Sequence, residues 1–154
     1  MSKGILLFAH SSPVHDYYSM AEYCAKRIKR FLNLPVSIVT DEESYRPSDL
    51  FDKVMFVLPD KSNKNKKEIW INKNRFLAYN YTPYDVTLLL DVDYVVNSDL
   101  LLKAFDFVDE IAAHRTIQFV NHYKYNQEAL SGFSHQLFWA TVIVFRKCQK
   151  AKHV

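Results

Sequence analysis

The hydrophobic positions along the chain fall into short continuous runs that alternate with stretches of helical spacing. A run without polar alternation is typical of a strand that is covered on both faces, as in a parallel sheet. Runs of apolar and β-branched residues predict six strands, at residues 4–9, 35–40, 53–58, 86–90, 116–120 and 140–145.

Three helices are expected between these strands. Residues 17–31 carry apolar side chains on one side and charged side chains on the other, which predicts an amphipathic helix whose charged face is most simply solvated. A second helix is expected over residues 68–81, packed on the sheet, and Ser98 can cap a third whose apolar residues lie between positions 101 and 108. This order predicts an α/β fold, with a mostly parallel, Rossmann-like sheet flanked by helices.

Length, composition and charge narrow the class of protein. The chain has 154 residues, of which 49% are hydrophobic and only two are glycines. These values predict one compact domain and exclude a disordered or low-complexity chain. A net charge of +3 is far from that of a dedicated nucleic-acid binder, although it is compatible with an anionic substrate.

The sequence contains neither a signal-peptide core nor an apolar stretch long enough to span a membrane. Cys24 and Cys148 fit no metal-binding spacing and are expected to be reduced thiols. We therefore expect a soluble, cytoplasmic protein. Residues 61–67 hold four lysines and no apolar residue. They are expected to form a solvated loop, with closure over a diphosphate or contact with a nucleic-acid backbone as the functional alternatives.

Two aspartates follow the most apolar run directly. Residues 86–90 end in Asp91-Val92-Asp93, and ligands of open α/β sheets bind at the carboxyl ends of the strands. Because Mn²⁺ and Mg²⁺ prefer carboxylate oxygens, we predict that Asp91 and Asp93 converge on one such cation, which would hold a substrate's phosphates. The alternative is a solvated turn, since an Asp-x-Asp triplet arises readily by chance in a chain with this many aspartates.

The polar loop at residues 10–16 follows the first predicted strand and is expected at the same edge of the sheet. His10 and Ser11 are candidates for contacts with a nucleotide, and an ordinary capped turn is the alternative. The chain has no Gly-x-Gly-x-x-Gly and no P-loop, so neither of these phosphate-binding motifs is supported. Three histidines share no metal spacing and are expected to be structural. They are His114, His122 and His135.

Four segments carry a resemblance to a known family. They are residues 72–76, the strand at 86–90 with Asp91-Val92-Asp93, the following Tyr94-Val95-Val96, and residues 138–145. Together they resemble the nucleotide-sugar-binding half of a glycosyltransferase of the GT-A fold, and the likeness spans most of the chain. Phage-encoded members are the nearest in character, which would place the protein in the host cytoplasm.

The resemblance implies a nucleotide-sugar donor, with a UDP-sugar favoured, and a Mn²⁺ or Mg²⁺ cofactor. Asp93 would be the direct metal ligand, Asp91 would support the metal or the donor ribose, and Arg75 would lie near the donor. The cation would offset the negative charge that grows on the leaving nucleoside diphosphate. The region that holds the base and ribose is matched by His10, Ser11 and Asp41.

The chain also departs from the family. In related enzymes a further metal ligand, often a histidine, and most acceptor contacts come from a segment beyond the position where this chain ends. We therefore expect residues 1–154 to form a single nucleotide-sugar-binding domain that lacks the C-terminal acceptor-side segment. The acceptor therefore stays open. No catalytic base can be named either, so the sequence does not decide between a retaining and an inverting reaction. Membrane insertion is not expected, and nucleic acid would be a partner only as the acceptor.

The leading prediction is thus a metal-dependent glycosyltransferase, or its donor-binding half. A catalytically silent nucleotide-binding fragment or module is the alternative. Nucleotidyltransferases and metal-dependent phosphohydrolases also place Asp pairs at strand ends, but the missing Gly-rich phosphate loop and the absence of further clustered carboxylates weigh against both. A purely structural protein is the last alternative.

Overall fold

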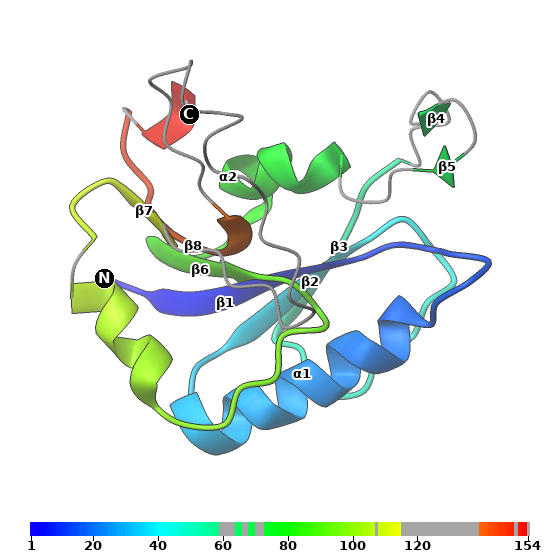
Figure 1. Cartoon of the computed structure of the whole chain (residues 1–154), viewed down its shortest axis with the longest axis horizontal. Helices are drawn as coiled ribbons and strands as arrows, with labels where there is room; N and C mark the ends of the chain where they lie inside the picture. The colour runs from blue at the N-terminus through cyan, green and yellow to red at the C-terminus, as the bar shows by residue number, and fades with distance from the viewer. Residues whose placement is uncertain are drawn as a thin grey trace, which may run out of the picture.

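The computed structural model describes residues 1–58, 64–65, 68–69, 73–106, 108–114, 139–149 and 151–153. In this part of the chain, the centre is a six-stranded sheet in the order β3-β2-β1-β6-β8-β7 (Figure 1). Its strands are β1 (Lys3–Ala9), β2 (Val36–Thr40), β3 (Lys53–Phe56), β6 (Val86–Leu90), β7 (Ile111–His114) and β8 (Trp139–Arg146).

The sheet is mixed but mostly parallel, as the sequence predicts. Strands β3, β2, β1 and β6 run parallel to one another, whereas β8 is antiparallel to both β6 and β7. Ala9 pairs with Thr40 and Leu7 pairs with Leu90, so the carboxyl ends of β1, β2 and β6 lie at one edge of the sheet. We call this the carboxyl edge, and the residues that leave it directly are His10, Asp41 and Asp91.

Helix α1 (Tyr17–Leu32) covers one face of the sheet (Figure 1). Its buried side chains, including Cys24 and Ile28, join a core with the residues of β1 that face the same way. Apolar residues at helical spacing produce this contact because burying one stripe is what stabilises a surface helix. The predicted helix over residues 17–31 is confirmed.

The opposite face is covered by a shorter segment. A 3₁₀ turn η1 (Lys73–Leu77) leads into α2 (Ala78–Tyr81), and Ala78 packs with Leu6 and Phe8 of β1 in a second core. In Figure 1, α1 and α2 lie on opposite sides of the sheet. The α-helix predicted over residues 68–81 is therefore confirmed only at Ala78–Tyr81, since Lys73–Leu77 form a 3₁₀ turn and residues 70–72 lie outside the described residues.

The first half of that expected helix includes a strand instead. Glu68–Ile69 (β5) pairs antiparallel with Lys64–Asn65 (β4). The segment is rich in β-branched and aromatic residues at positions 69–71, which favour extended backbone over helix. Lys64 and Asn65, expected in a solvated loop, form part of this pair, and the rest of residues 61–67 lies outside the described residues.

Other boundaries differ in smaller ways. Strand β3 ends two residues before the predicted position because its partner β2 ends at Thr40, whose carbonyl accepts the last pairing bond from Val57 N at 2.8 Å. The helix expected after Ser98 is the 3₁₀ helix η2 (Leu100–Asp106). A further 3₁₀ turn, η4 (Ala151–His153), follows β8. The strand predicted at residues 116–120 lies outside the described residues, and β7 was not predicted.

The described helices are all too short or too polar to cross a membrane. Both cysteines are unpaired, as expected, with Cys24 buried in the core and Cys148 partly exposed.

Candidate functional site

The carboxylate of Asp41 gathers three groups at the ends of β1 and β2. Its Oδ1 accepts hydrogen bonds from the backbone N–H of Ser11 at 2.7 Å and from the hydroxyl of Tyr18 at 3.0 Å. His10 Nδ1 lies 3.7 Å from the same oxygen. Burial alone would raise the pKa of Asp41, but the neighbouring His10 imidazole and the hydrogen bonds from Ser11 and Tyr18 outweigh it and hold this pKa below its ordinary value.

His10 is a buried polar side chain at this edge. It is 6% exposed, and its ring is tilted against that of Phe8 with 6.0 Å between the centroids. With Nδ1 directed at Asp41, the other nitrogen, Nε2, is buried and has no hydrogen-bond partner among the described residues. Because buried polar atoms are nearly always hydrogen-bonded, Nε2 is a hydrogen-bonding group that a ligand at this edge could satisfy.

Asp91 and Arg75 form an ion pair at the end of β6. Arg75 Nη1 donates to Asp91 Oδ1, and their side chains are 11% and 25% exposed. Asp91 is anchored from β8 by Thr141, whose carbonyl accepts the Asp91 N–H at 3.2 Å. Arg75 comes from η1, so the pair links three elements that lie apart in the sequence.

Burial acts on both members of this pair. It raises the pKa of Asp91, against the opposing effects of Arg75 and of a hydrogen bond from Thr141. It lowers the pKa of the Arg75 guanidinium, although the negative charges of Asp91 and Asp93 oppose this. Within the part of the chain that the structure describes, the second terminal nitrogen of Arg75, Nη2, is buried and unpartnered like His10 Nε2. An arginine in this position presents a fixed positive charge with one donor still available to an anion.

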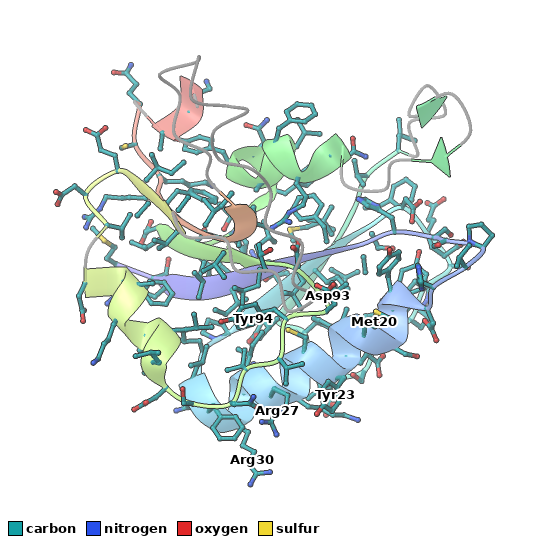
Figure 2. All side chains as sticks on the ribbon, in the orientation of Figure 1. Met20, Tyr23, Arg27, Arg30, Asp93 and Tyr94 are labelled. Atoms are coloured by element: carbon teal, nitrogen blue, oxygen red, sulfur yellow. The ribbon has the colours of Figure 1, made fainter. Side chains whose placement is uncertain are left out.

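Asp93 lies at the other end of a tight turn and is exposed. The turn is closed by a hydrogen bond from Tyr94 N to Asp91 O at 3.1 Å. With the residues that the structure describes, the Asp93 carboxylate forms no hydrogen bond or ion pair, so it remains open to solvent. Figure 2 shows Asp93 and Tyr94 beside helix α1.

Helix α1 holds the loop that carries Asp93. Arg27 Nε donates to Val96 O at 2.8 Å, and its Nη2 donates to the side chain of Asn97. The thiol of Cys24 lies 3.4 Å from Tyr94 O. Burial, reinforced by the negative charge of Asp93, raises the pKa of that thiol to about 12, so it stays protonated and can donate this bond.

The structure brings the predicted site residues into two groups. His10 and Ser11 meet at Asp41, and Arg75 meets Asp91, with Asp93 two residues further along. No cluster of three or more His, Cys, Asp or Glu side chains suited to a metal ion occurs within the described residues. His114 lies in β7, whereas His122 and His135 lie outside the described residues.

Sequence reasoning misses three residues that shape this site. Tyr18 has no feature that separates it from its neighbours on an apolar helix face, and Thr141 lies inside an apolar run. Arg27 belongs to the charged face expected to be solvated, and that expectation is wrong for this residue because the backbone and side chain of residues 96 and 97 accept its hydrogen bonds.

No protein-family model matches the sequence, and no curated protein matches it. Solved structures do match. The galactosyltransferase LgtC, in complex with donor and acceptor sugar analogues, superposes on 98% of this chain with a TM-score of 0.68 and 15% identity. The glycosyltransferase GlyE of Streptococcus pneumoniae TIGR4 covers 99% of the chain at a TM-score of 0.59 and 14% identity.

The chain has the GT-A fold. This fold is also related to that of CMP:2-keto-3-deoxy-manno-octonic acid synthetase complexed with CTP, which covers 99% of the chain and 76% of its own length, with a TM-score of 0.54 and 11% identity. The matched region spans 60% of LgtC and 36% of GlyE. At these identities the likeness establishes the GT-A fold. It does not establish the reaction, which has to be argued from the residues of the site.

Proposed function

We propose that the chain is a metal-dependent glycosyltransferase, or the donor-binding half of one, that transfers a sugar from a nucleotide-sugar donor to an unidentified acceptor. The observation that carries this proposal is a pair of buried polar atoms at the carboxyl edge, His10 Nε2 and Arg75 Nη2, that find no hydrogen-bond partner in the described residues. Leaving a polar atom buried without a partner is costly, so their presence at the ligand-binding edge of a GT-A fold supports a ligand with polar and anionic groups.

A nucleoside diphosphate sugar has such groups in the required order. Its base and ribose would lie along Ser11, Asp41 and His10 between β1 and β2, and its diphosphate would lie near Arg75 and Asp93 beyond β6. Hydrogen-bonding groups, among them the Asp41 carboxylate as an acceptor for sugar hydroxyls, would thus face the nucleoside, and the cationic donor Arg75 would face the charged phosphates. We favour a UDP-sugar as the donor.

The cation is part of the proposal. Asp93 is the exposed carboxylate and would be the direct ligand of Mn²⁺ or Mg²⁺, while Asp91 supports the site from its half-buried position. Two carboxylates suit such a hard cation, with the donor's phosphate oxygens supplying further ligands. When bound, the cation would stabilise the negative charge that develops on the departing nucleoside diphosphate.

Calorimetric titration of UDP in the presence of Mn²⁺, and again with a chelator, tests this proposal. We expect binding only with Mn²⁺, and a loss of at least about tenfold in affinity for Asp93→Ala. Asp99→Ala is the matched control, because Asp99 is also exposed but lies at the start of η2. Tight binding in chelator, or equal effects of the two variants, would count against the proposed site.

Turnover separates the remaining candidates. Incubation with a panel of UDP-sugars should release UDP, whereas a catalytically silent binding module would bind UDP without releasing it from any donor. Nucleotidyl transfer is the second candidate, since the CMP:2-keto-3-deoxy-manno-octonic acid synthetase shares the fold. That reaction consumes a nucleoside triphosphate and releases pyrophosphate, so pyrophosphate release from CTP or UTP would favour it.

A further inference from the structure

The half-buried carboxylate of the Asp-x-Asp pair is already compensated by a cation from the protein itself. Arg75 Nη1 contacts Asp91 Oδ1, and the guanidinium is more enclosed than the carboxylate, at 11% against 25% exposed. Arginine stays charged under all ordinary conditions. Asp91 is therefore neutralised before any metal ion arrives, whereas the carboxylate of Asp93 faces solvent.

The scaffold fixes this ion pair. The Asp91 backbone is bonded to Thr141 on β8, and Arg75 belongs to η1, which leads directly into α2. The first residue of α2, Ala78, is buried against the sheet. Because both partners are held by packed elements, the guanidinium remains near the two aspartates in the absence of ligand.

A free divalent cation and a cation carried by a diphosphate therefore meet different sites. A free cation meets two carboxylates and one guanidinium, with a combined charge of −1, and is repelled by Arg75. A diphosphate brings its own negative charge, which can ligate the cation and also accept the unused Nη2 donor of Arg75. The same residue thus opposes the free ion and favours the complex.

We propose that Arg75 is a positioning residue that couples the metal to the nucleotide: as the internal counter-cation of Asp91, it makes the site take up the divalent cation together with a nucleoside diphosphate rather than alone. The inference rests on the proposed function for the identity of the diphosphate ligand. Its first test, in contrast, needs only the metal.

Mn²⁺ alone is titrated into the protein at pH 7.5, with the electron paramagnetic resonance signal of free Mn²⁺ as the readout. Arg75→Gln removes the competing charge, so it should bind Mn²⁺ about tenfold more tightly than wild type. Arg75→Lys keeps the charge and should stay within about threefold of wild type. Arg46→Gln is the control for charge, because Arg46 is exposed and its hydrogen bonds to described residues go to the carbonyls of Glu43 and Tyr45.

With UDP present, the order of the affinities of wild type and Arg75→Gln should reverse. Arg75→Gln loses the donor to the diphosphate and should bind UDP with Mn²⁺ at least about tenfold more weakly than wild type. An Arg75→Gln variant that binds Mn²⁺ alone no better than wild type would overturn the inference, as would tight binding of Mn²⁺ alone by wild type.

A second comparison covers the case in which Arg75→Gln fails to fold with Asp91 left unpaired. The double variant Arg75→Gln/Asp91→Asn replaces the ion pair by two amides and keeps the combined charge at −1. If Arg75 neutralises Asp91, this variant should bind Mn²⁺ alone within about threefold of wild type. A loss of more than about tenfold would show that Asp91 ligates the free ion despite Arg75, and would overturn the inference.

The two proposals fail in different experiments. If UDP does not bind or no donor turns over, the glycosyltransferase proposal fails, while the response of Mn²⁺ alone to these variants still decides the role of Arg75.

Discussion

At the scale of single residues, Gly4 shows how closely the first strand is packed. A Cβ built on Gly4 would lie 2.4 Å from ring atoms of Tyr84. That ring is 6% exposed, and its hydroxyl is 2.6 Å from the Ser37 Oγ on β2. Burial raises the pKa of Tyr84 to about 12, so the phenol stays neutral and hydrogen-bonded over the physiological range. Gly4 is thus needed for a close contact between β1 and an aromatic ring.

Gly4→Ala is therefore expected to destabilise the protein by about 1–3 kcal/mol, because either the ring or the strand has to move. Urea unfolding at pH 7 measures this change. The double variant Gly4→Ala/Tyr84→Leu removes the obstructing ring and should lose less than the sum of its two single changes. A stability for Gly4→Ala within about 0.5 kcal/mol of wild type would contradict the packing argument.

At the scale of helices and strands, the sequence predicts best where burial is complete. The runs that form β1, β2 and β6 are covered on both faces, so their residues are continuously apolar or β-branched, and β6 matches its predicted range of 86–90. The edge strand β7, Ile-Ala-Ala-His, has no such run and gave no signal. Helix α1 was predictable because one stripe of it is buried and the rest is polar.

The candidate site was predictable only in part, for a related reason. His10, Asp41 and Asp91 each follow a strand directly, so their common edge could be inferred from strand order. The contacts between particular side chains could not be inferred in this way. The contact of Arg75 with Asp91 depends on where η1 lies over the sheet, and that position is set by packing between segments that lie apart in the sequence.

The N-terminus of α1 offers a prediction at this scale. Asp16 accepts hydrogen bonds from the backbone N–H of Ser19 at 3.0 Å and from its hydroxyl at 2.6 Å. These bonds, led by the one from the Ser19 side chain, lower the pKa of Asp16. The folded-state pKa is thus below the unfolded one, so the cap stabilises the protein above the unfolded value and ceases to do so as the pH falls through the folded value.

Asp16→Ala should accordingly lower the melting temperature at pH 7, whereas Asp16→Asn, which keeps a capping oxygen, should lower it less. Thermal unfolding followed by circular dichroism provides the measurement. The gap between wild type and Asp16→Ala should narrow as the pH falls below the unfolded pKa of about 3.9 and then through the lower folded-state pKa of Asp16. A gap that is unchanged in acid would mean that the charge of Asp16 takes no part.

At the scale of the whole molecule, several carboxylates tie distant parts of the chain together. Asp85 accepts hydrogen bonds from the backbone and side chain of Ser2, and Asp52 accepts one from Val36 N at 2.8 Å and pairs with Lys29. Asp41 joins the loop after β1 to helix α1 and to the end of β2. All three carboxylates have lowered pKa values, and each depends on contacts that exist only in the folded chain.

These shifts predict acid unfolding. A carboxylate whose pKa is lowered by folding contributes stability above its unfolded value, and this contribution disappears as the pH falls through the folded value. The effect of Asp91 on stability has the opposite pH dependence, because burial raises its pKa. Its contribution to the stability is present below the unfolded pKa and is lost as the pH rises through the folded pKa. Within the described residues, five carboxylates have lowered pKa values, since Asp16 and Glu42 join these three, and only Asp91 has a raised one. The urea midpoint should therefore be nearly constant from pH 7 to about pH 5 and should fall below about pH 4.

Asp41→Asn tests how much of the loss of stability in acid comes from the Asp41 carboxylate at the candidate site. The amide still offers an oxygen to Ser11 N and to the Tyr18 hydroxyl but removes the charge that faces His10. The variant should have a lower urea midpoint than wild type at pH 7 and should approach wild type at pH 3, whereas Asp49→Asn, at an exposed position, should match wild type throughout. The same variant should weaken UDP binding if the nucleoside lies along Asp41, and Asp49→Asn should not. Loss of stability without loss of UDP binding would restrict Asp41 to a structural role between β1, β2 and α1.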